Sequence, residues 1–94
     1  MFEQIEITTE MILNTLRINR NIILDNVIKY NTWIYERYNR EIRLGITPTS
    51  NTADEIYELD FYIQELCDLP EKYKNVTSYS DIVFPTPPNF VRGI

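Results

Sequence analysis

The residues that most often carry acid–base or metal chemistry are scarce in this chain. It contains no histidine, and this removes the commonest general base and the commonest metal ligand. Cys67 is the single cysteine, so no internal disulfide can form, and a thiolate nucleophile would have no histidine to activate it. We therefore expect Cys67 to be a small core residue beside the apolar face of a helix.

Carboxylates are the remaining side chains that could take part in catalysis or metal binding. Glu55 and Glu58 are three positions apart, so a helix would place them one turn apart, where they could bind a cation or act as an acid–base pair. A solvated helix face explains them better. With two glycines in all, the chain cannot form a glycine-rich phosphate loop. We expect a protein that is not an enzyme, with no catalytic residue, metal or cofactor.

Aromatic side chains are more abundant, at 13% of the chain with seven tyrosines. Rings with a polar edge suit half-buried positions and protein interfaces. A formal charge of -5 argues against nucleic acid and against anionic membranes as partners, because both attract basic surfaces. We expect a protein partner instead, and the candidate contact residues are Tyr35, Tyr38, Tyr57, Tyr62, Phe84, Pro85, Pro88 and Phe90.

The length of 94 residues predicts one domain, with a helical part at 1–70 and an extended arm at 71–94. Segment 1–10 has neither the basic start nor the apolar run of a signal peptide, and no stretch reaches the roughly 20 apolar residues that span a bilayer. The predicted fold class is mainly α: a small helical hairpin of two to three helices with an extended, proline-containing C-terminal arm.

Residues 8–44 show helical periodicity, because apolar side chains recur mostly at steps of three, four or seven. We expect Thr8 or Thr9 to cap the start of the helix, and Gly45 to end the segment. A single helix of this length would measure about 54 Å, which is long for so small a domain. An interruption near 29–32 is therefore expected, followed by a short helix or an extended segment.

A second helix begins at a predicted capping box, in which Thr52 caps the helix and Glu55 reaches back to it. Apolar side chains then follow at steps of three and four up to Leu66. Pro70 is expected to end this helix, because its ring pushes Leu69 out of the helical region. Beyond the proline the periodicity is lost.

Charge differs between the two helical segments. Residues 16–44 carry six basic and three acidic side chains, whereas residues 52–71 carry seven acidic side chains and no basic one. Two interpretations stay open. Either the helices pair antiparallel with complementary charged rims, or the acidic helix meets a basic partner.

The segment DIVFPTPPNF, residues 81–90, has three prolines between two phenylalanines. Phe84 and Thr86 each precede a proline and are expected to be extended. Large apolar side chains are not expected to stay in solvent. The arm therefore either packs on its own helices or lies on a partner.

Four segments of the chain form an ordered series of motifs: LRINRNIILD (16–25), WIYERYNREIRLGITPTS (33–50), YIQELCDLPEKY (62–73) and DIVFPTPPNF (81–90). This series resembles that of small tail-assembly chaperone proteins of tailed bacteriophages, which include proteins encoded beside tail fibre genes. Cys67 stands where that family usually has arginine, and Phe84 where it usually has tryptophan. The matching positions are Arg17, Arg20, Asn21, Tyr62, Leu66, Asp68, Leu69, Pro70, Phe84, Pro85 and Pro88.

The resemblance implies a non-enzymatic protein that binds a tail or tail fibre polypeptide in the host cytoplasm during assembly, with or without retention in the virion tail. It implies no oligomeric state. The main alternative is a permanent structural component of the tail or baseplate. A small adaptor or inhibitor acting on a host protein is a third class of function that suits an acidic helix with few reactive groups.

Overall fold

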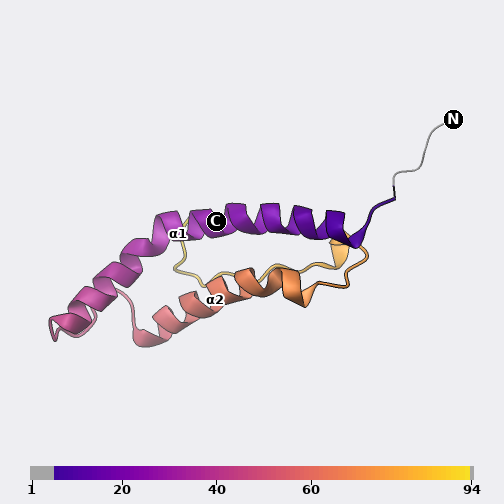
Figure 1. Ribbon diagram of the computed structural model, residues 1–94. Coiled ribbons are helices and arrows are strands. Elements are labelled where there is room, and N and C mark those ends of the chain that lie inside the picture. Colours follow the sequence, from indigo (N-terminus) through magenta and orange to yellow (C-terminus); the bar gives the residue numbers. More distant parts are fainter. Residues whose placement is uncertain (1–5, 94) are drawn as a thin grey trace.

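The computed structural model describes residues 6–93 and shows two helices and an extended C-terminal arm (Figure 1). Helix α1 spans Thr9–Arg43, helix α2 spans Ala53–Lys72, and a short 3-10 turn, η1, spans Tyr79–Asp81. The helices run antiparallel and the arm returns along them (Figure 1). The predicted fold class, a mainly α hairpin with an extended arm, is confirmed, and residues 6–93 contain no strand.

Residues 1–5 and 94 lie outside the described part of the chain. Half of segment 1–10, for which no signal peptide is expected, is therefore not covered. The described part is elongated, with extents of 70 × 20 × 19 Å and a radius of gyration of 17.8 Å. A compact domain of this length would have a radius of gyration of about 12 Å. The core is accordingly a narrow seam along the helix pair.

The core seam is formed by side chains from both helices. Its position explains the helical periodicity, because residues three and four apart on each helix face the other one. Most of the residues between these positions are exposed on the other sides of each helix. The buried members of the core seam are Leu16, Val27, Ile34, Leu59, Tyr62, Leu66 and Leu69.

Helix α1 is continuous, so the predicted interruption near 29–32 is wrong. Its 35 residues correspond to about 53 Å, which the elongated molecule accommodates. Asn31 donates from Nδ2 to the Val27 carbonyl at 2.8 Å, and Thr32 donates to the Ile28 carbonyl. Side chains that bond to the preceding turn are compatible with a helix but accompany bending. Figure 1 shows α1 changing direction near its middle.

Local signals fix where both helices begin. Thr8 caps α1, because its hydroxyl accepts a hydrogen bond from the Met11 amide at 3.2 Å. Thr52 and Glu55 form the predicted capping box of α2, in which each side chain accepts from the other residue's amide. These predictions are confirmed because each depends on residues within one helical turn.

The turn between the helices is fixed by Gly45 and Glu41. Gly45 has a φ of 70°, and the Ile46 amide donates to the Glu41 carbonyl at 2.9 Å, which closes a Schellman motif. The buried Glu41 carboxylate accepts from Thr49 Oγ1 at 2.8 Å and from Arg37 Nε at 3.1 Å. These contacts lower the pKa of the Glu41 carboxyl, with the Thr49 hydrogen bond as the largest cause.

Helix α2 continues past Pro70 to Lys72, so the prediction that Pro70 ends it is wrong. Proline has no amide hydrogen for the Leu66 carbonyl, four residues earlier. Arg20 on α1 supplies a replacement donor, because its Nη1 lies 3.5 Å from the Leu66 carbonyl oxygen and 3.4 Å from that of Cys67. A contact 46 residues away in sequence thus stabilises the last turn of α2.

The two helices do not pair through charge. Both ion pairs within residues 6–93 join residues close in sequence, one inside α1 and one at the end of α2. Between side chains, the hydrogen bond that links the two helices runs from the Tyr35 hydroxyl to the Asp60 carboxylate. The complementary-rim interpretation is therefore not supported in this part of the chain, and the packing between α1 and α2 is mainly apolar.

The C-terminal arm packs on its own helices. Tyr73, just after α2, fixes where the arm begins, because its hydroxyl accepts from the Val83 amide at 3.0 Å and faces the Val83 carbonyl at 3.4 Å. In the free protein the arm thus packs on its own helices, which is one of the two alternatives left open by the sequence. The arm residues that pack against the core seam are Ile82, Phe84, Phe90 and Val91.

The arm ends in a set of contacts on the middle of α1, which we call the latch: Tyr30, Asn31, Trp33, Arg92 and Gly93. Asn31 is buried and pairs with the Arg92 backbone in both directions, donating to the carbonyl at 2.9 Å and accepting from the amide at 3.0 Å. Gly93 has a φ of 83°, and a Cβ there would overlap the Tyr30 ring. The Arg92 guanidinium lies 5.3 Å from the Trp33 ring centroid.

Candidate functional site

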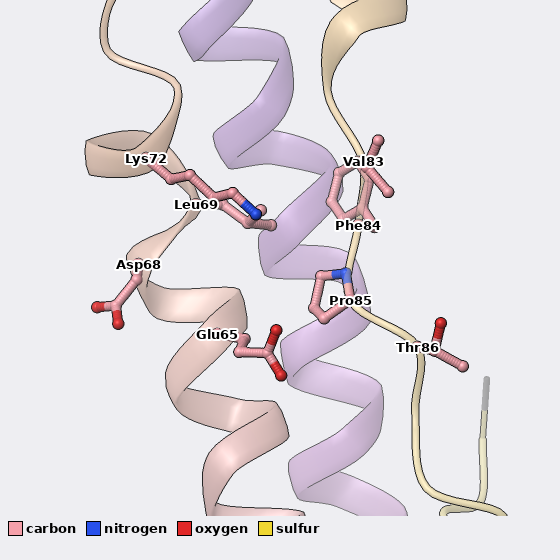
Figure 2. A pocket seen from close by; sticks show the side chains of 8 residues that line it. All are labelled: Glu65, Asp68, Leu69, Lys72, Val83, Phe84, Pro85 and Thr86. Atoms are coloured by element: carbon pink, nitrogen blue, oxygen red, sulfur yellow. The ribbon is translucent and has the colours of Figure 1, made fainter.

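A groove of about 460 Å³ opens between the second half of α2 and the start of the arm (Figure 2). The sequence predicted four of its lining residues as motif or contact positions, namely Asp68, Leu69, Phe84 and Pro85. The full lining is Glu65, Asp68, Leu69, Lys72, Val83, Phe84, Pro85 and Thr86.

Helix α2 supplies one wall of the groove. Its lining residues lie at positions 65, 68, 69 and 72, a helical spacing that places them on one side of the helix. Leu69 is buried at the base, whereas Glu65, Asp68 and Lys72 are exposed along the rim. Figure 2 shows the Glu65 carboxylate and the Lys72 ammonium directed towards the arm, and the Asp68 carboxylate directed away from it. Asp68 accepts a hydrogen bond from Gln64 at 2.9 Å.

The arm supplies the opposite wall. The bond between the Val83 amide and Tyr73 fixes the chain at the entrance to the groove. Phe84 and Pro85 are half-buried and close the side next to the core seam, and Phe84 packs against that seam. Val83 projects outward, with 69% of its surface exposed. The wall is therefore apolar and held in place by both a hydrogen bond and packing.

Segments from two of the four sequence motifs line this groove, and a third contacts the helix that forms one wall. Residues 68–69 and 84–85 form its two walls. Arg20 lies behind the α2 wall, where it bonds to backbone carbonyls of α2 and donates from Nε to Asn21 Oδ1 at 2.8 Å. Arg20 of segment 16–25 thus stabilises α2, the helix that contains most of segment 62–73. Phe84 of segment 81–90 packs against the core seam.

Other motif residues have structural or peripheral positions. Leu66 is buried in the core seam, and Pro70 is half-buried in the last turn of α2. Arg17 is exposed and donates to Asn14 Oδ1 at 3.2 Å, away from the groove lining. Cys67 is exposed, so the expectation that it is a core residue is wrong. It lies one position after the buried Leu66, which turns it away from the seam.

The predicted contact tyrosines divide by burial. Tyr62 is only 3% exposed and packs in the core seam rather than offering its ring to a partner, and burial raises the pKa of its hydroxyl. Tyr35 is half-buried and donates to Asp60, and its pKa is raised mainly by burial and further by that carboxylate. Tyr38 is half-buried. Tyr57 is 67% exposed and is free to meet a partner.

Tyr57 is accompanied by Phe61, a residue that the sequence interpretation missed. The two rings stack with centroids 6.1 Å apart and planes 15° from parallel. Phe61 is 53% exposed. The spacing of four residues on a helix was the available signal, because it places two side chains on the same face one turn apart. We call Tyr57 and Phe61 the aromatic pair.

Pro88 and Phe90 lie beyond the groove. Both are half-buried, and Phe90 lines a second hollow of about 200 Å³ together with Trp33 and Arg92 of the latch. Phe90 packs against the core seam, which explains why the arm follows the hairpin. In the free protein Phe90 thus holds the arm, whereas the groove and the aromatic pair remain open.

The groove offers carboxylates, one ammonium and apolar surface, which suit the side chains of a polypeptide. Within residues 6–93, no three His, Cys, Asp or Glu side chains gather in a metal-binding arrangement. None of the helices described by the structure is long and apolar enough to cross a membrane.

Comparison with known proteins gives no match to a family model, to a curated protein or to a solved structure. The function has to be inferred from the residues and their arrangement.

Proposed function

We propose that this protein is a non-enzymatic assembly chaperone that binds a tail or tail fibre polypeptide of a bacteriophage. The observation that supports the proposal is that segments 62–73 and 81–90 line one groove, and that Arg20 of segment 16–25 bonds to the helix that forms one of its walls. These are three of the four segments that carry the resemblance to tail-assembly chaperones. Binding sites are usually surface hollows, so motif residues placed at such a hollow are suited to binding a partner.

The proposed mechanism is the covering of apolar surface on a partner chain. Polypeptides that have not yet folded or assembled expose apolar surface, and such surface is prone to aggregation. The groove and the aromatic pair together provide an accessible apolar surface on one side of α2. A partner segment docked there would be withheld from aggregation until assembly proceeds in the host cytoplasm.

Co-expression with the tail or tail fibre polypeptide encoded beside this protein tests the proposal. We expect the soluble fraction of that polypeptide to rise when the protein is present, because its apolar segment is covered. An equal soluble fraction with and without the protein, together with no isolable complex, would overturn the proposal.

A permanent structural component of the tail or baseplate is the second candidate. It is favoured by apolar side chains on the outer face of α1, where Met11, Ile18 and Ile22 are 45%, 62% and 57% exposed. A face of this kind suits a protein that stays covered within an assembly. Mass spectrometry of purified particles tests the second candidate. Absence from the particles excludes a permanent component, whereas stoichiometric copies fit either a permanent component or a chaperone that is retained.

A further inference from the structure

We propose that the polypeptide segment bound by this protein is basic and aromatic, and that it docks along α2 across the aromatic pair and into the groove. This inference rests on the proposed function, since it names the chemistry of the partner segment. It concerns the surface formed by Tyr57, Phe61, Glu65, Asp68 and the groove wall of the arm, which we call the docking surface.

The aromatic pair is continuous with the groove. Phe61 lies one helical turn before Glu65, and Asp68 follows at a further three positions, so all three share one side of α2. Two large stacked rings lie exposed next to an apolar-floored groove. Exposed aromatic side chains beside a hollow are typical anchors in protein interfaces. The docking surface therefore extends over about three turns of α2.

Charge selects the occupant. Helix α2 carries seven acidic side chains, of which Glu71 is paired with Lys74, and one basic side chain, Lys72, so the helix is net negative. No ion pair joins α2 to α1 within residues 6–93, so α1 does not neutralise this charge. Glu65 points into the groove, and Asp68 and Lys72 lie on its rim, so the lining has two carboxylates and one ammonium and is net negative (Figure 2). Lysine or arginine side chains of a partner complement these carboxylates, and aromatic or aliphatic side chains complement the rings and the groove floor.

The arm also limits how the partner is held. Pro85, Pro87 and Pro88 have no amide hydrogen, so this edge of the arm cannot add a regular strand from another chain. Recognition through main-chain strand pairing is therefore excluded along these residues. Affinity has to come from side chains, which makes it depend on the sequence of the partner segment.

The probe for this surface is a short fluorescein-labelled peptide with two lysines and two phenylalanines in a glycine and serine background. Binding to the purified full chain is measured by fluorescence anisotropy. We expect it to bind about tenfold more tightly than a peptide with glutamates for lysines or with serines for phenylalanines. Raising the salt from about 0.05 M to about 0.5 M should weaken binding, because the screening length shortens.

Surface variants locate the binding. Glu65→Gln/Asp68→Asn removes two charges from the rim, and Phe61→Ser removes one ring of the pair. Each should weaken binding of the lysine and phenylalanine peptide by about fivefold or more. The matched control is Asp25→Asn/Glu36→Gln, which removes two exposed charges from α1 and should change binding by less than about twofold. Circular dichroism shows whether each variant keeps its helices.

Three results would overturn the inference: equal binding of the glutamate peptide, an effect of the α1 control as large as that of the rim variant, or no binding of the basic aromatic peptide. These results are separable from failure of the proposed function. If the tail polypeptide is solubilised but the peptide does not bind, the docking surface is wrong and the chaperone proposal stands. If the peptide binds but the tail polypeptide is unaffected, the docking surface stands and the tail partner is wrong.

Discussion

At the scale of single residues, Asn31 has the most unusual position. It is a polar side chain with 1% of its surface exposed, and its amide is fully engaged by the Val27 carbonyl and both backbone groups of Arg92. Buried amides of this kind are stabilising only while every partner is present. Asn31 therefore couples the end of the arm to the middle of α1.

Replacing Asn31 with alanine is expected to destabilise the protein by about 1–3 kcal/mol, because the Arg92 amide and carbonyl lose their partner. Chemical denaturation followed by circular dichroism measures the loss. Asn39→Ala is the matched control, since Asn39 is exposed on the same helix, and should change stability by less than about 0.5 kcal/mol. Equal effects of the two variants would show that the latch does not hold the arm.

At the scale of secondary structure, the ends of α2 are set by different means. The start follows from the local capping box of Thr52 and Glu55. The end depends on Arg20, which lies on the other helix and reaches the Leu66 and Cys67 carbonyls. Pro70 and Arg20 thus compensate for each other, since the proline lacks an amide hydrogen for the Leu66 carbonyl and the arginine supplies a donor to it.

A double-mutant cycle tests this couple. Arg20→Ala is expected to cost about 0.5–1.5 kcal/mol of unfolding free energy, because the Leu66 carbonyl loses its side-chain donor. In a Pro70→Ala background the new amide can donate to that carbonyl, so the cost of Arg20→Ala should become smaller. Urea denaturation of the four proteins measures the coupling. Strictly additive changes would show that Arg20 does not compensate for the proline.

The turn between the helices should respond to pH through Glu41. Its pKa is lowered in the folded protein, first by the Thr49 hydrogen bond and also by Arg37, so its ionised form favours folding. That stability is fully present above the ordinary carboxyl pKa of 4.5 and is lost as the pH falls through the lowered folded value.

The stability difference between wild type and Glu41→Gln should therefore be largest near neutral pH and shrink as the solution is acidified below the ordinary pKa. Thermal melts across the pH range measure this difference. A difference that stays constant through the acidic range would mean that ionised Glu41 does not stabilise the turn.

The caps, the glycine turn and the mainly α hairpin could be predicted from sequence because each depends on neighbouring residues or on helical periodicity. The continuity of α1 could not, because α2 and the arm pack along its length. The passage of α2 through Pro70 could not, because it depends on the distant Arg20. In the candidate site, Phe84 and Pro85 were predictable from their motif. Tyr62 was misassigned because periodicity alone does not show which face a partner helix covers.

At the scale of the whole molecule, the elongated shape leaves little interior. A thin helix pair with one narrow core seam cannot bury all its apolar side chains. The exposed surplus includes the aromatic pair on α2 and Met11, Ile18 and Ile22 on the outer face of α1. A molecule of this form is suited to lying along a partner. The groove lined by motif residues is the surface where we propose that this contact occurs.

The most direct test of this account is size-exclusion chromatography of the protein co-expressed with its neighbouring tail or tail fibre polypeptide. We predict that the wild type and Asp25→Asn/Glu36→Gln elute together with the polypeptide. Glu65→Gln/Asp68→Asn should elute separately while keeping the wild-type melting temperature, because both side chains are exposed. Separate elution of the wild-type protein and the polypeptide, with no gain in the polypeptide's solubility, would contradict the account.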